Sequence, residues 1–347
     1  MAHGQHRIAD IASQAGLSAA TVDRVLNGRS GASARAAAAV ERAVLDLDRQ
    51  QWQARLGARS VVLDLVMQAP DRFSAAVRAA LEAELPTLAP ATVRARFHLR
   101  ESGSVGELAD ALDRVGTRGR ISQGVLLKAP DDPDIAAAIG RLAARGIPAV
   151  TVVTDVPGSR RIGYVGADNP GAGATAAFLM RQWLGRRPGV ILVTLSRAAF
   201  AGEWERLTSF RAALDGARPR REVVVLADAD GLDAGTARLV SEVLRRRRDI
   251  AGVYSIGGGN RSIVAELAAA GVTPVVHLGH DLDADNIALL LGGDLTAVLH
   301  HDLRADLAAG CRHLLRHHRL LPAAPAPRPT PVQIVTRHNL PPALRPG

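Results

Sequence analysis

Residues 8–27 read IADIASQAGLSAATVDRVLN, and this stretch predicts two short helices joined by a tight turn. Apolar side chains recur at helical spacing in both halves, as Ile8, Ile11 and Ala12 and then Val22, Val25 and Leu26. Each helix therefore has one apolar stripe to bury against the other. Gly16 can adopt the left-handed conformation that ends the first helix, and Ser18 can cap the free N–H groups that open the second. The stretch is a candidate helix-turn-helix.

The second of these helices leaves one polar face uncovered. The residues off its apolar stripe are Ala19, Ala20, Asp23, Arg24 and Asn27. Such a face can enter the major groove of DNA, which is wide enough to admit a helix. Many all-helical domains contain a helix, a glycine turn and another helix without touching DNA, so the spacing alone leaves both interpretations open.

With a third helix expected across residues 36–47, the segment resembles the N-terminal DNA-binding domain of the lactose-repressor (LacI/GalR) family of bacterial transcription regulators. The residues that carry the resemblance are 8–12, 15–18, 21–22 and 24–27. In that family two residues early in the second helix and an arginine four to five positions on reach base edges, which implies Ala19, Ala20 and Arg24 here. Arg24 can donate two parallel hydrogen bonds to guanine, a contact worth ~1–3 kcal/mol of discrimination, whereas the alanines offer only methyl groups. The candidate DNA contacts are Ser18, Ala19, Ala20, Thr21, Arg24, Asn27, Arg29 and Leu56.

Residues 49–60 follow the helical head as a polar, arginine-bearing linker that contains Trp52 and Leu56. In the family the matching segment folds into a short hinge helix on DNA, where paired leucines wedge into the minor groove. This chain lacks the Pro and Asn that usually precede that helix, and Leu56 lies one or two positions early for the wedging residue. Leu56 or Trp52 either inserts into DNA or packs against the rest of the protein, and both outcomes stay open.

The length and composition of the chain limit the kinds of protein it can be. At 347 residues it exceeds one compact core, so we expect two to three folding units. Its apolar runs fall short of the ~18 residues needed to cross a bilayer, and residues 1–7 carry no apolar signal segment, so we expect a cytoplasmic protein. The lone Cys311 excludes an internal disulfide and a multi-cysteine metal site.

The net charge of +9 is located at the two ends of the chain. Residues 1–60 hold 8 arginines against 5 acidic residues, residues 312–347 hold 6 arginines and no acidic residue, and the middle is balanced. A basic N-terminal unit on a neutral body suits a protein that touches phosphates with one end, although a solvated surface explains the same charge. Nearly every cation is an arginine, with Lys128 the sole lysine, and we draw no mechanism from that pattern.

From residue 61 onward, short apolar runs alternate with amphipathic helical stretches, which is typical of parallel sheets with helices on both faces. The expected strands are 61–67, 93–99, 124–128, 148–154, 162–166, 190–195, 223–227, 252–256, 274–279 and 296–300. The expected helices are 73–85, 105–115, 135–145, 171–184, 203–214, 234–248, 262–270, 284–291 and 303–317. So many strands suit two doubly wound α/β lobes better than one sheet. Residues 332–336 alternate as a further strand, after a stiff proline-rich connector.

The order of these elements resembles the type I periplasmic sugar-binding-protein fold, which forms the core of the lactose-repressor family. In that fold the chain crosses between the lobes three times, and we expect the crossings near 156–160, 282–286 and 320–330. The expected domains are an all-α helix-turn-helix headpiece at 1–48, a hinge or linker at 49–60 and a bilobed effector-binding domain at 61–341. The expected lobes are 61–156 plus 283–325, and 157–282 plus 326–341.

In open parallel sheets ligands collect beyond the carboxyl ends of the strands, and polar residues follow many of the expected strands here. Candidate effector contacts are Phe73, Asp131, Asp155, Arg197, Trp204, Gly258, Asn260, His280, Asp281 and His301. Carboxylates and amides can pair with sugar hydroxyls while a ring covers the apolar face of the sugar. The resemblance implies hydroxyl contacts for Asp131, Asp281 and His301. It also places Trp204 where the fold often has an arginine and Phe73 where it often has an aromatic residue.

Some candidates have a local alternative. Asp131 or Asp168 can simply cap the helix that follows it, and Phe73 can pack in the core. Residues 257–261, Gly-Gly-Gly-Asn-Arg, can cradle an anion where a helix opens. They lack the pattern of a nucleotide-binding loop, so a tight turn is the favoured interpretation.

We expect no metal site, no cofactor and no catalysis. Adjacent residues on an extended chain point to opposite faces, so His300 and His301 cannot both face one cleft to hold zinc. No nucleophile elbow, paired-carboxylate spacing or Ser-His-Asp context stands out in the sequence.

The sequence thus predicts a ligand-responsive transcription regulator that binds double-stranded DNA. We expect a homodimer on a roughly palindromic operator, because one helix-turn-helix reads only a few base pairs. The lobes would bind a carbohydrate-like effector: a sugar, a polyol or a nucleoside. Three alternatives stay open: a stand-alone solute-binding protein, an enzyme on the same fold, and a cytoplasmic sugar sensor that has lost operator binding. The alanines at positions 19 and 20 favour the third of these.

Overall fold

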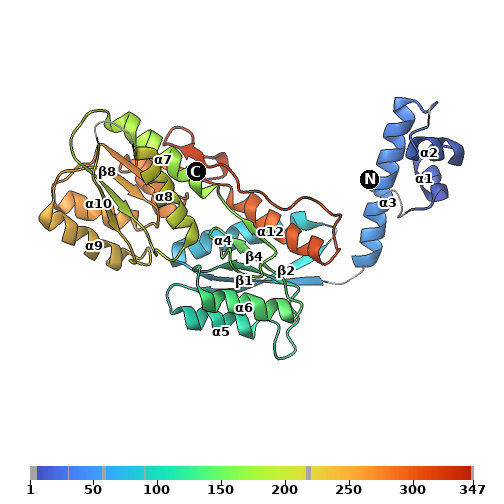
Figure 1. Ribbon diagram of the computed structural model, residues 1–347, viewed down its shortest axis with the longest axis horizontal. Coiled ribbons are helices and arrows are strands. Elements are labelled where there is room, and N and C mark those ends of the chain that lie inside the picture. Colours follow the sequence, from blue (N-terminus) through green and yellow to red (C-terminus); the bar gives the residue numbers. More distant parts are fainter. Residues whose placement is uncertain (1–5, 30, 57–59, 90, 216–219, 345–347) are drawn as a thin grey trace.

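The computed structural model describes residues 6–29, 31–56, 60–89, 91–215 and 220–344, and for residues 49, 51–56 and 343 it describes the backbone alone. Three N-terminal helices stand apart from two α/β lobes that lie side by side (Figure 1). None of the helices within these ranges is both long and apolar enough to span a membrane.

The N-terminal helices are α1 (Ile8–Ala15), α2 (Ala19–Leu26) and α3 (Ala34–Leu56). Gly16 has φ +64° and ends α1, while Ser18 accepts a hydrogen bond from the Thr21 N–H at 3.2 Å and caps α2. The turn chemistry expected from the sequence is therefore present. A small core of its own holds the three helices together, formed by Ile11, Ala12, Val22, Val40 and Ala43.

Helix α3 continues through residues 49–56, which we expected as a linker. The physical reason is local, since this segment consists of residues that tolerate a helix well, and no Gly or Pro occurs before Gly57. The side chains of Trp52 and Leu56, two candidates for insertion into DNA, lie outside what the structure describes.

The first lobe is a five-stranded, all-parallel sheet in the order β2-β1-β3-β4-β5. Its strands are β1 (Ser60–Gln68), β2 (Thr92–Arg100), β3 (Gly124–Lys128), β4 (Ala149–Val152) and β5 (Gly163–Val165). One face packs against α4 (Asp71–Glu84) and α12 (Leu303–His317), and the other against α5 (Val105–Arg114) and α6 (Pro133–Ala144). A short 3-10 helix, η1 (Leu85–Leu88), follows α4.

The second lobe is a six-stranded sheet in the order β11-β10-β9-β8-β6-β7, parallel except for β11. Its strands are β6 (Val190–Thr194), β7 (Val223–Leu226), β8 (Ile250–Ser255), β9 (Val276–His280), β10 (Ala297–His300) and β11 (Gln333–Val335). Its helices are α7 (Asn169–Leu184), α8 (Ala201–Leu214), α9 (Asp233–Arg246), α10 (Asn260–Ala269) and α11 (Ala284–Gly292), followed by η2 (Pro342–Leu344). Helices α7 and α8 cover one face, and α9 and α10 cover the other.

The strands and helices expected after residue 60 are all present, and the bilobed α/β architecture is confirmed. Two lobe boundaries differ from those expected. Strand β5 pairs with β4, so residues 156–160 form a turn inside the first lobe, where Ser159 N donates to Val156 O. Residues 282–286 open α11, because the Asp283 side chain accepts from Asn286 N at 2.8 Å and caps that helix. The chain crosses between lobes after β5, between β10 and α12, and again between α12 and β11.

Candidate functional site

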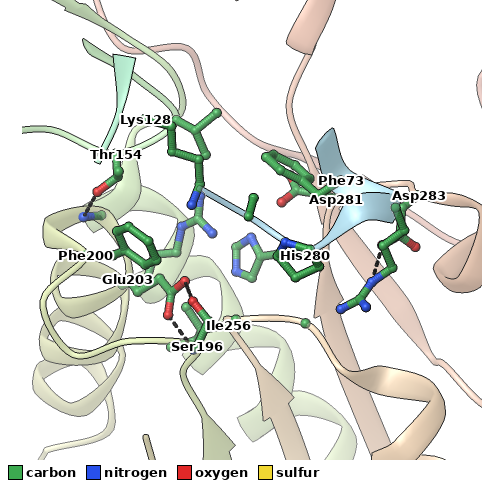
Figure 2. Close-up of a pocket in the computed structure, with 18 of the residues that line it drawn as sticks. Phe73, Lys128, Thr154, Ser196, Phe200, Glu203, Ile256, His280, Asp281 and Asp283 are labelled. Atoms are coloured by element: carbon green, nitrogen blue, oxygen red, sulfur yellow. Dashed lines mark hydrogen bonds and ion pairs between the residues drawn. The ribbon is translucent and has the colours of Figure 1, made fainter. Parts of the chain in front are cut away.

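The carboxyl ends of strands from both sheets meet at a cavity between the lobes (Figure 2). Its charged and polar walls come from both lobes and include Arg72, Lys128, Thr154, Ser196, Glu203, Arg206, His280, Asp281, Asp283 and Asn286. Two rings, Phe73 and Phe200, complete it. The room left between these side chains is about 70 Å³, well below the roughly 300–1,000 Å³ of common ligand pockets. The lobes are closed on each other.

Lys128, the sole lysine of the chain, is the last residue of β3 and is buried in the cavity wall. Its Nζ lies 3.8 Å from the centre of the Phe200 ring and donates to the Gln68 carbonyl at 3.3 Å. Burial lowers the pKa of Lys128 to about 8, against the opposing charge of Glu203. The cavity therefore contains an ammonium group that is poorly solvated and open to a hydrogen-bonding ligand.

Glu203, in the first turn of α8, faces the same cavity and is held by the segment after β6. Its carboxylate accepts from the Ser196 backbone N–H at 2.7 Å and from the Ser196 hydroxyl. Burial raises the pKa of Glu203, and the bonds from Ser196 and the charge of Lys128 oppose that rise. These bonds hold the carboxylate in a fixed position beside Lys128 and Arg206.

Arg206 depends on an unusually close approach of two helices. It is 4% exposed, and its Nε donates to the Asn169 Oδ1 at 2.8 Å. A Cβ atom on Gly173 of α7 would lie 2.2 Å from the Arg206 carbonyl oxygen. Position 173 must therefore be glycine for α8 to pack where it does, and that packing brings Arg206 into the cavity.

Asp281 lies on the floor of the cavity, directly after β9, with φ +63°. Its Oδ1 is 3.3 Å from His301 Nε2, and the other ring nitrogen of His301 is 2.6 Å from the Asp306 Oδ2. Burial opposes a charge on His301, but the two carboxylates outweigh it and raise the pKa of His301 to about 9. Burial likewise opposes a charge on Asp281, and His301 nevertheless lowers the pKa of that carboxyl. The neighbouring His280 ring bonds to the Tyr254 hydroxyl at 2.8 Å, and burial lowers its pKa.

Several bonds cross from one lobe to the other around the cavity (Figure 2). Arg72 of α4 forms an ion pair with Asp283 at 3.2 Å and donates to the Gly231 carbonyl at 2.7 Å. Gly202 N donates to the Thr154 hydroxyl at 3.1 Å. These contacts hold the lobes together and must break if the lobes separate.

The structure brings four of the ten expected effector contacts to the cavity, namely Phe73, Gly258, His280 and Asp281. His301 lies one step behind, bonded to Asp281. Asn260 is buried and bonds to Asn286 and His277. Its amide groups are thus used within the second lobe.

The remaining four expected contacts do not line the cavity. Asp155 bonds to Arg161 and Thr151 in the first lobe, and Arg197 pairs with Asp230. Trp204 is 52% exposed, on the outer side of α8. The Asp131 side chain is exposed, and its backbone N–H donates to the Ala199 carbonyl at 2.8 Å.

The expected set lacked Lys128, Glu203 and Arg206, three of the charged residues that converge in the cavity. Lys128 had a signal in the sequence, because the one lysine of an arginine-rich chain stands at the end of an expected strand. Glu203 and Arg206 also follow an expected strand, 190–195, but which residues there reach the cavity depends on which side of α8 faces inward. Within the described residues, no group of three or more His, Cys, Asp or Glu side chains is placed to hold a metal ion.

A second candidate surface lies on α2. Ser18, Ala19, Ala20, Arg24, Asn27 and Arg29 are all exposed, and Thr21 is partly so. Arg24 Nε donates to the Ala20 carbonyl at 3.3 Å. Asp23 holds the other two polar side chains, since Asn27 donates to it at 2.7 Å and Arg29 at 2.8 Å. The face is therefore accessible and partly preorganised.

Residues 63–314 match the family model of a periplasmic binding protein domain. The glucose-galactose binding protein GanP of Geobacillus stearothermophilus superposes with a TM-score of 0.71 at 16% identity, over 82% of this chain and 99% of that one. A structure described as a LacI transcriptional regulator from Bacteroides fragilis gives 0.69 at 15% identity, over 81% and 99%. The fructose binding periplasmic domain of a hybrid two component system gives 0.70 at 18% identity, over 80% and 91%. At these identities the likeness concerns the fold. No curated protein sequence matches the chain significantly.

Proposed function

The chain belongs to the periplasmic binding protein domain family, and from that premise we propose that its lobes bind a small carbohydrate-like ligand that controls DNA binding by the N-terminal helices. The observation that carries the ligand proposal is the convergence of charged groups and two phenyl rings at the carboxyl ends of strands from both sheets. Such a convergence is the usual form of a small-molecule site in open α/β sheets.

The charges in the cavity favour a neutral, polyhydroxylated ligand. Three cations line it, Arg72, Lys128 and Arg206, and three carboxylates, Glu203, Asp281 and Asp283. Ammonium and guanidinium groups donate to hydroxyl oxygens, and carboxylates accept from hydroxyl protons, so a molecule rich in hydroxyls satisfies both kinds. The phenyl rings can cover its apolar faces. A sugar, a polyol or a nucleoside has these properties, and glucose, galactose and fructose are named for the neighbouring structures.

Ligand entry requires the lobes to separate, because about 70 Å³ is too little for such a molecule. The three crossings between the lobes are the natural hinges. A ligand that binds one lobe arrangement better than the other then shifts the balance between them, by as much as its two affinities differ. Ligand binding either lowers the affinity for DNA and releases it, or raises that affinity.

For the N-terminal helices we propose major-groove binding by α2, with Arg24 as the base-reading residue. The exposed face of α2 and the cap at Ser18 support this assignment. Two copies of the chain would bind together, since one such unit reads few base pairs. A groove of about 800 Å³ offers a surface on which a second copy can pack. It is lined by α4 and α12, through Ala76, Ala79, Ala83, Ala305 and Ala308 among others, and by second-lobe residues that include Leu282, Gln333 and Leu344. A regulator of this kind acts in the cytoplasm.

A second function deserves a test of its own: a ligand sensor without specific DNA binding. The observation that favours it is the pair of alanines, Ala19 and Ala20, at two of the three positions implied to read bases. Selection of bound sequences from a random duplex pool, titrated with salt, separates the two functions. Enrichment of a palindromic sequence supports the regulator, and no enrichment at modest salt supports the sensor.

The ligand proposal is tested by a thermal-shift screen of the full chain across sugars, polyols and nucleosides. A ligand at 100 times its dissociation constant stabilises the folded protein by ~2.7 kcal/mol. Each hit is repeated with Asp281→Asn, which replaces the carboxylate on the cavity floor with an amide of the same size. We expect the shift to shrink strongly in this variant. Conversion of a bound hit into a product would instead identify an enzyme.

A further inference from the structure

A second cavity lies in the first lobe, away from the space between the lobes. It runs between β2, the edge strand of the sheet, and α5, and we call it the β2–α5 groove. It measures about 260 Å³ and is lined by Arg96, His98, Arg100, Arg114, Arg120 and Asp64, with apolar residues between them. It shares no lining residue with the cavity between the lobes.

Strand alternation explains why cations gather there. In β2 every second residue from Arg94 to Arg100 is an arginine or a histidine. Side chains two apart in a strand point to one side of the sheet. Arg96 and His98 both bind Asp64 of β1. Val66, two residues after Asp64 and on the same side of the sheet, packs in the core formed with α5 and α6. Arg96 and His98 therefore lie on the side of the sheet that faces α5. Arg114 at the end of α5 and Arg120 on the following loop add to the groove from the opposite wall.

The single carboxylate that lines the groove is already saturated. Asp64 is 1% exposed, its Oδ2 accepts from Arg96 Nη2 at 2.8 Å, and its Oδ1 lies 2.7 Å from His98 Nε2. Burial alone would raise the pKa of Asp64, but the bonds from His98 and Arg96 outweigh burial and lower it. The carboxylate therefore remains charged and anchors the floor of the groove.

The groove lining contains more cationic side chains than carboxylates. Arg100 is 3.4 Å from Glu107. In the described part of the chain, neither Arg114 nor Arg120 lies within ion-pair distance of a carboxylate, and both are exposed. The groove thus keeps two guanidinium groups that no carboxylate of the described residues pairs with directly.

One donor in the groove wall has no acceptor. Arg96 Nε is buried and has no hydrogen-bond partner among the described residues, although the Nη2 atom of the same side chain donates to both Asp64 and the Ile121 carbonyl. A buried N–H without an acceptor is costly, and because this Nε has almost no contact with solvent, that cost belongs to the groove wall itself.

From these observations we propose that the β2–α5 groove binds a phosphomonoester, a small metabolite that carries a terminal phosphate. The guanidinium fork matches phosphate oxygens with two parallel hydrogen bonds. Arg114 and Arg120 supply the ion pairs. The volume of about 260 Å³ lies slightly below the roughly 300–1,000 Å³ of common ligand pockets, so only a small ligand fits. A duplex DNA backbone offers the same phosphate chemistry, but it needs a continuous surface strip rather than a walled groove.

The test measures phosphate binding to the full chain by isothermal titration calorimetry in a low-salt buffer, with inorganic phosphate and glucose 6-phosphate as probes. The informative variant is Arg114→Gln with Arg120→Gln, which leaves the contacts of Asp64 intact. The matched control is Arg181→Gln with Arg238→Gln, two exposed arginines on α7 and α9 of the second lobe. Both pairs remove the same charge. We expect the groove variant to bind each probe at least tenfold more weakly, and the control to stay within twofold of the unmodified protein.

Equal phosphate affinity in the groove variant and the unmodified protein would overturn the proposal, since the probe would then bind elsewhere. Absence of phosphate binding to the unmodified protein would also overturn it. If the groove variant loses affinity for duplex DNA while neither probe binds, the groove is a DNA-backbone contact and the metabolite proposal is wrong. This experiment does not depend on the cavity between the lobes, so its failure leaves the sugar proposal untouched.

Discussion

The imidazole of His301 and the carboxylate of Asp306 are joined at 2.6 Å, and this contact lies where the chain passes from the second lobe to the first. His301 follows β10, and Asp306 belongs to α12. On its other side the ring contacts Asp281 in the cavity. The Thr330 hydroxyl, near the third crossing, donates to the Asp306 Oδ1 at 3.2 Å. From Asp281, the second crossing is therefore one contact away, at His301, and the third crossing is three contacts away, at Thr330.

The first prediction concerns pH and His301. The folded pKa of about 9 exceeds the unfolded value, so the stabilisation is complete below about pH 6.5 and is lost as the pH rises through 9, with a size of roughly 3 kcal/mol. Urea unfolding at pH 6 and pH 9.5 measures it. We expect His301→Gln to remove most of the loss between these two values, and the exposed His338→Gln to leave it unchanged. An equal loss in His301→Gln would contradict the prediction.

The second prediction concerns Lys128 as a ligand contact. Lys128→Met keeps the length and the apolar stem of the side chain but removes the donor. Once a ligand is known, calorimetry should show at least a tenfold weaker affinity. The control is Arg261→Met, on the exposed side of α10, for which the affinity should stay within twofold. Unchanged binding by Lys128→Met would exclude a direct contact.

The third prediction concerns the proton on Lys128. Because the chain has one lysine, reductive methylation with ¹³C-formaldehyde gives a single side-chain signal besides the terminal amine. Burial lowers the pKa, so this signal should titrate near pH 8, about two units below an exposed lysine. The same signal should move when a ligand enters the cavity. Titration near pH 10 would show that the group is well solvated.

The fourth prediction concerns the close contact between α7 and α8. Gly173→Ala places a methyl group against the Arg206 backbone, and overpacking of this kind costs roughly 1–3 kcal/mol. The unfolding free energy should fall by that amount, and ligand affinity should fall too, because Arg206 is displaced. Gly106→Ala in α5 is the matched control, since the nearest atom lies 3.9 Å from the added methyl. That control should be neutral or stabilising.

The fifth prediction concerns Arg24. If this residue contacts guanine, charge reversal in Arg24→Glu should abolish the enrichment of specific duplex sequences, with at least a tenfold loss of affinity for a selected sequence. Arg181→Glu changes the net charge equally on a distant helix and should keep specific binding. Fluorescence anisotropy with the selected duplex and a scrambled duplex provides the measurement. Equal losses in the two variants would indicate a nonspecific charge effect.

Much of the fold could be predicted from the sequence because its signals are local. Apolar runs mark strands buried on both faces, and Gly16 with Ser18 fixes the first turn by backbone chemistry alone. The lobe boundaries could not be located in this way. The segment Pro157–Gly158 fits a turn between two strands of one sheet as well as a passage between two sheets, and only strand pairing distinguishes them.

The site was predictable to the extent that it follows from strand ends. Asp281 and His280 close β9 and reach the cavity for that reason. Asp155 also lies near a strand end, yet its carboxylate forms an ion pair with Arg161, six residues on, and does not reach the cavity. On α8 the sequence offered Trp204 beside Glu203, and the rotation of the helix about its axis, set by the packing at Gly173, turned the acid inward and the indole outward.

The unbroken course of α3 affects how motion in the lobes reaches the N-terminal helices. Helix α3 ends at Leu56, and β1 begins at Ser60, four residues on. Four backbone steps span at most about 14 Å. The end of α3 therefore stays within that distance of the start of β1, whichever way the first lobe turns. If two copies bind DNA together, as we propose, this limit ties the spacing between their α2 helices to the orientation of their first lobes.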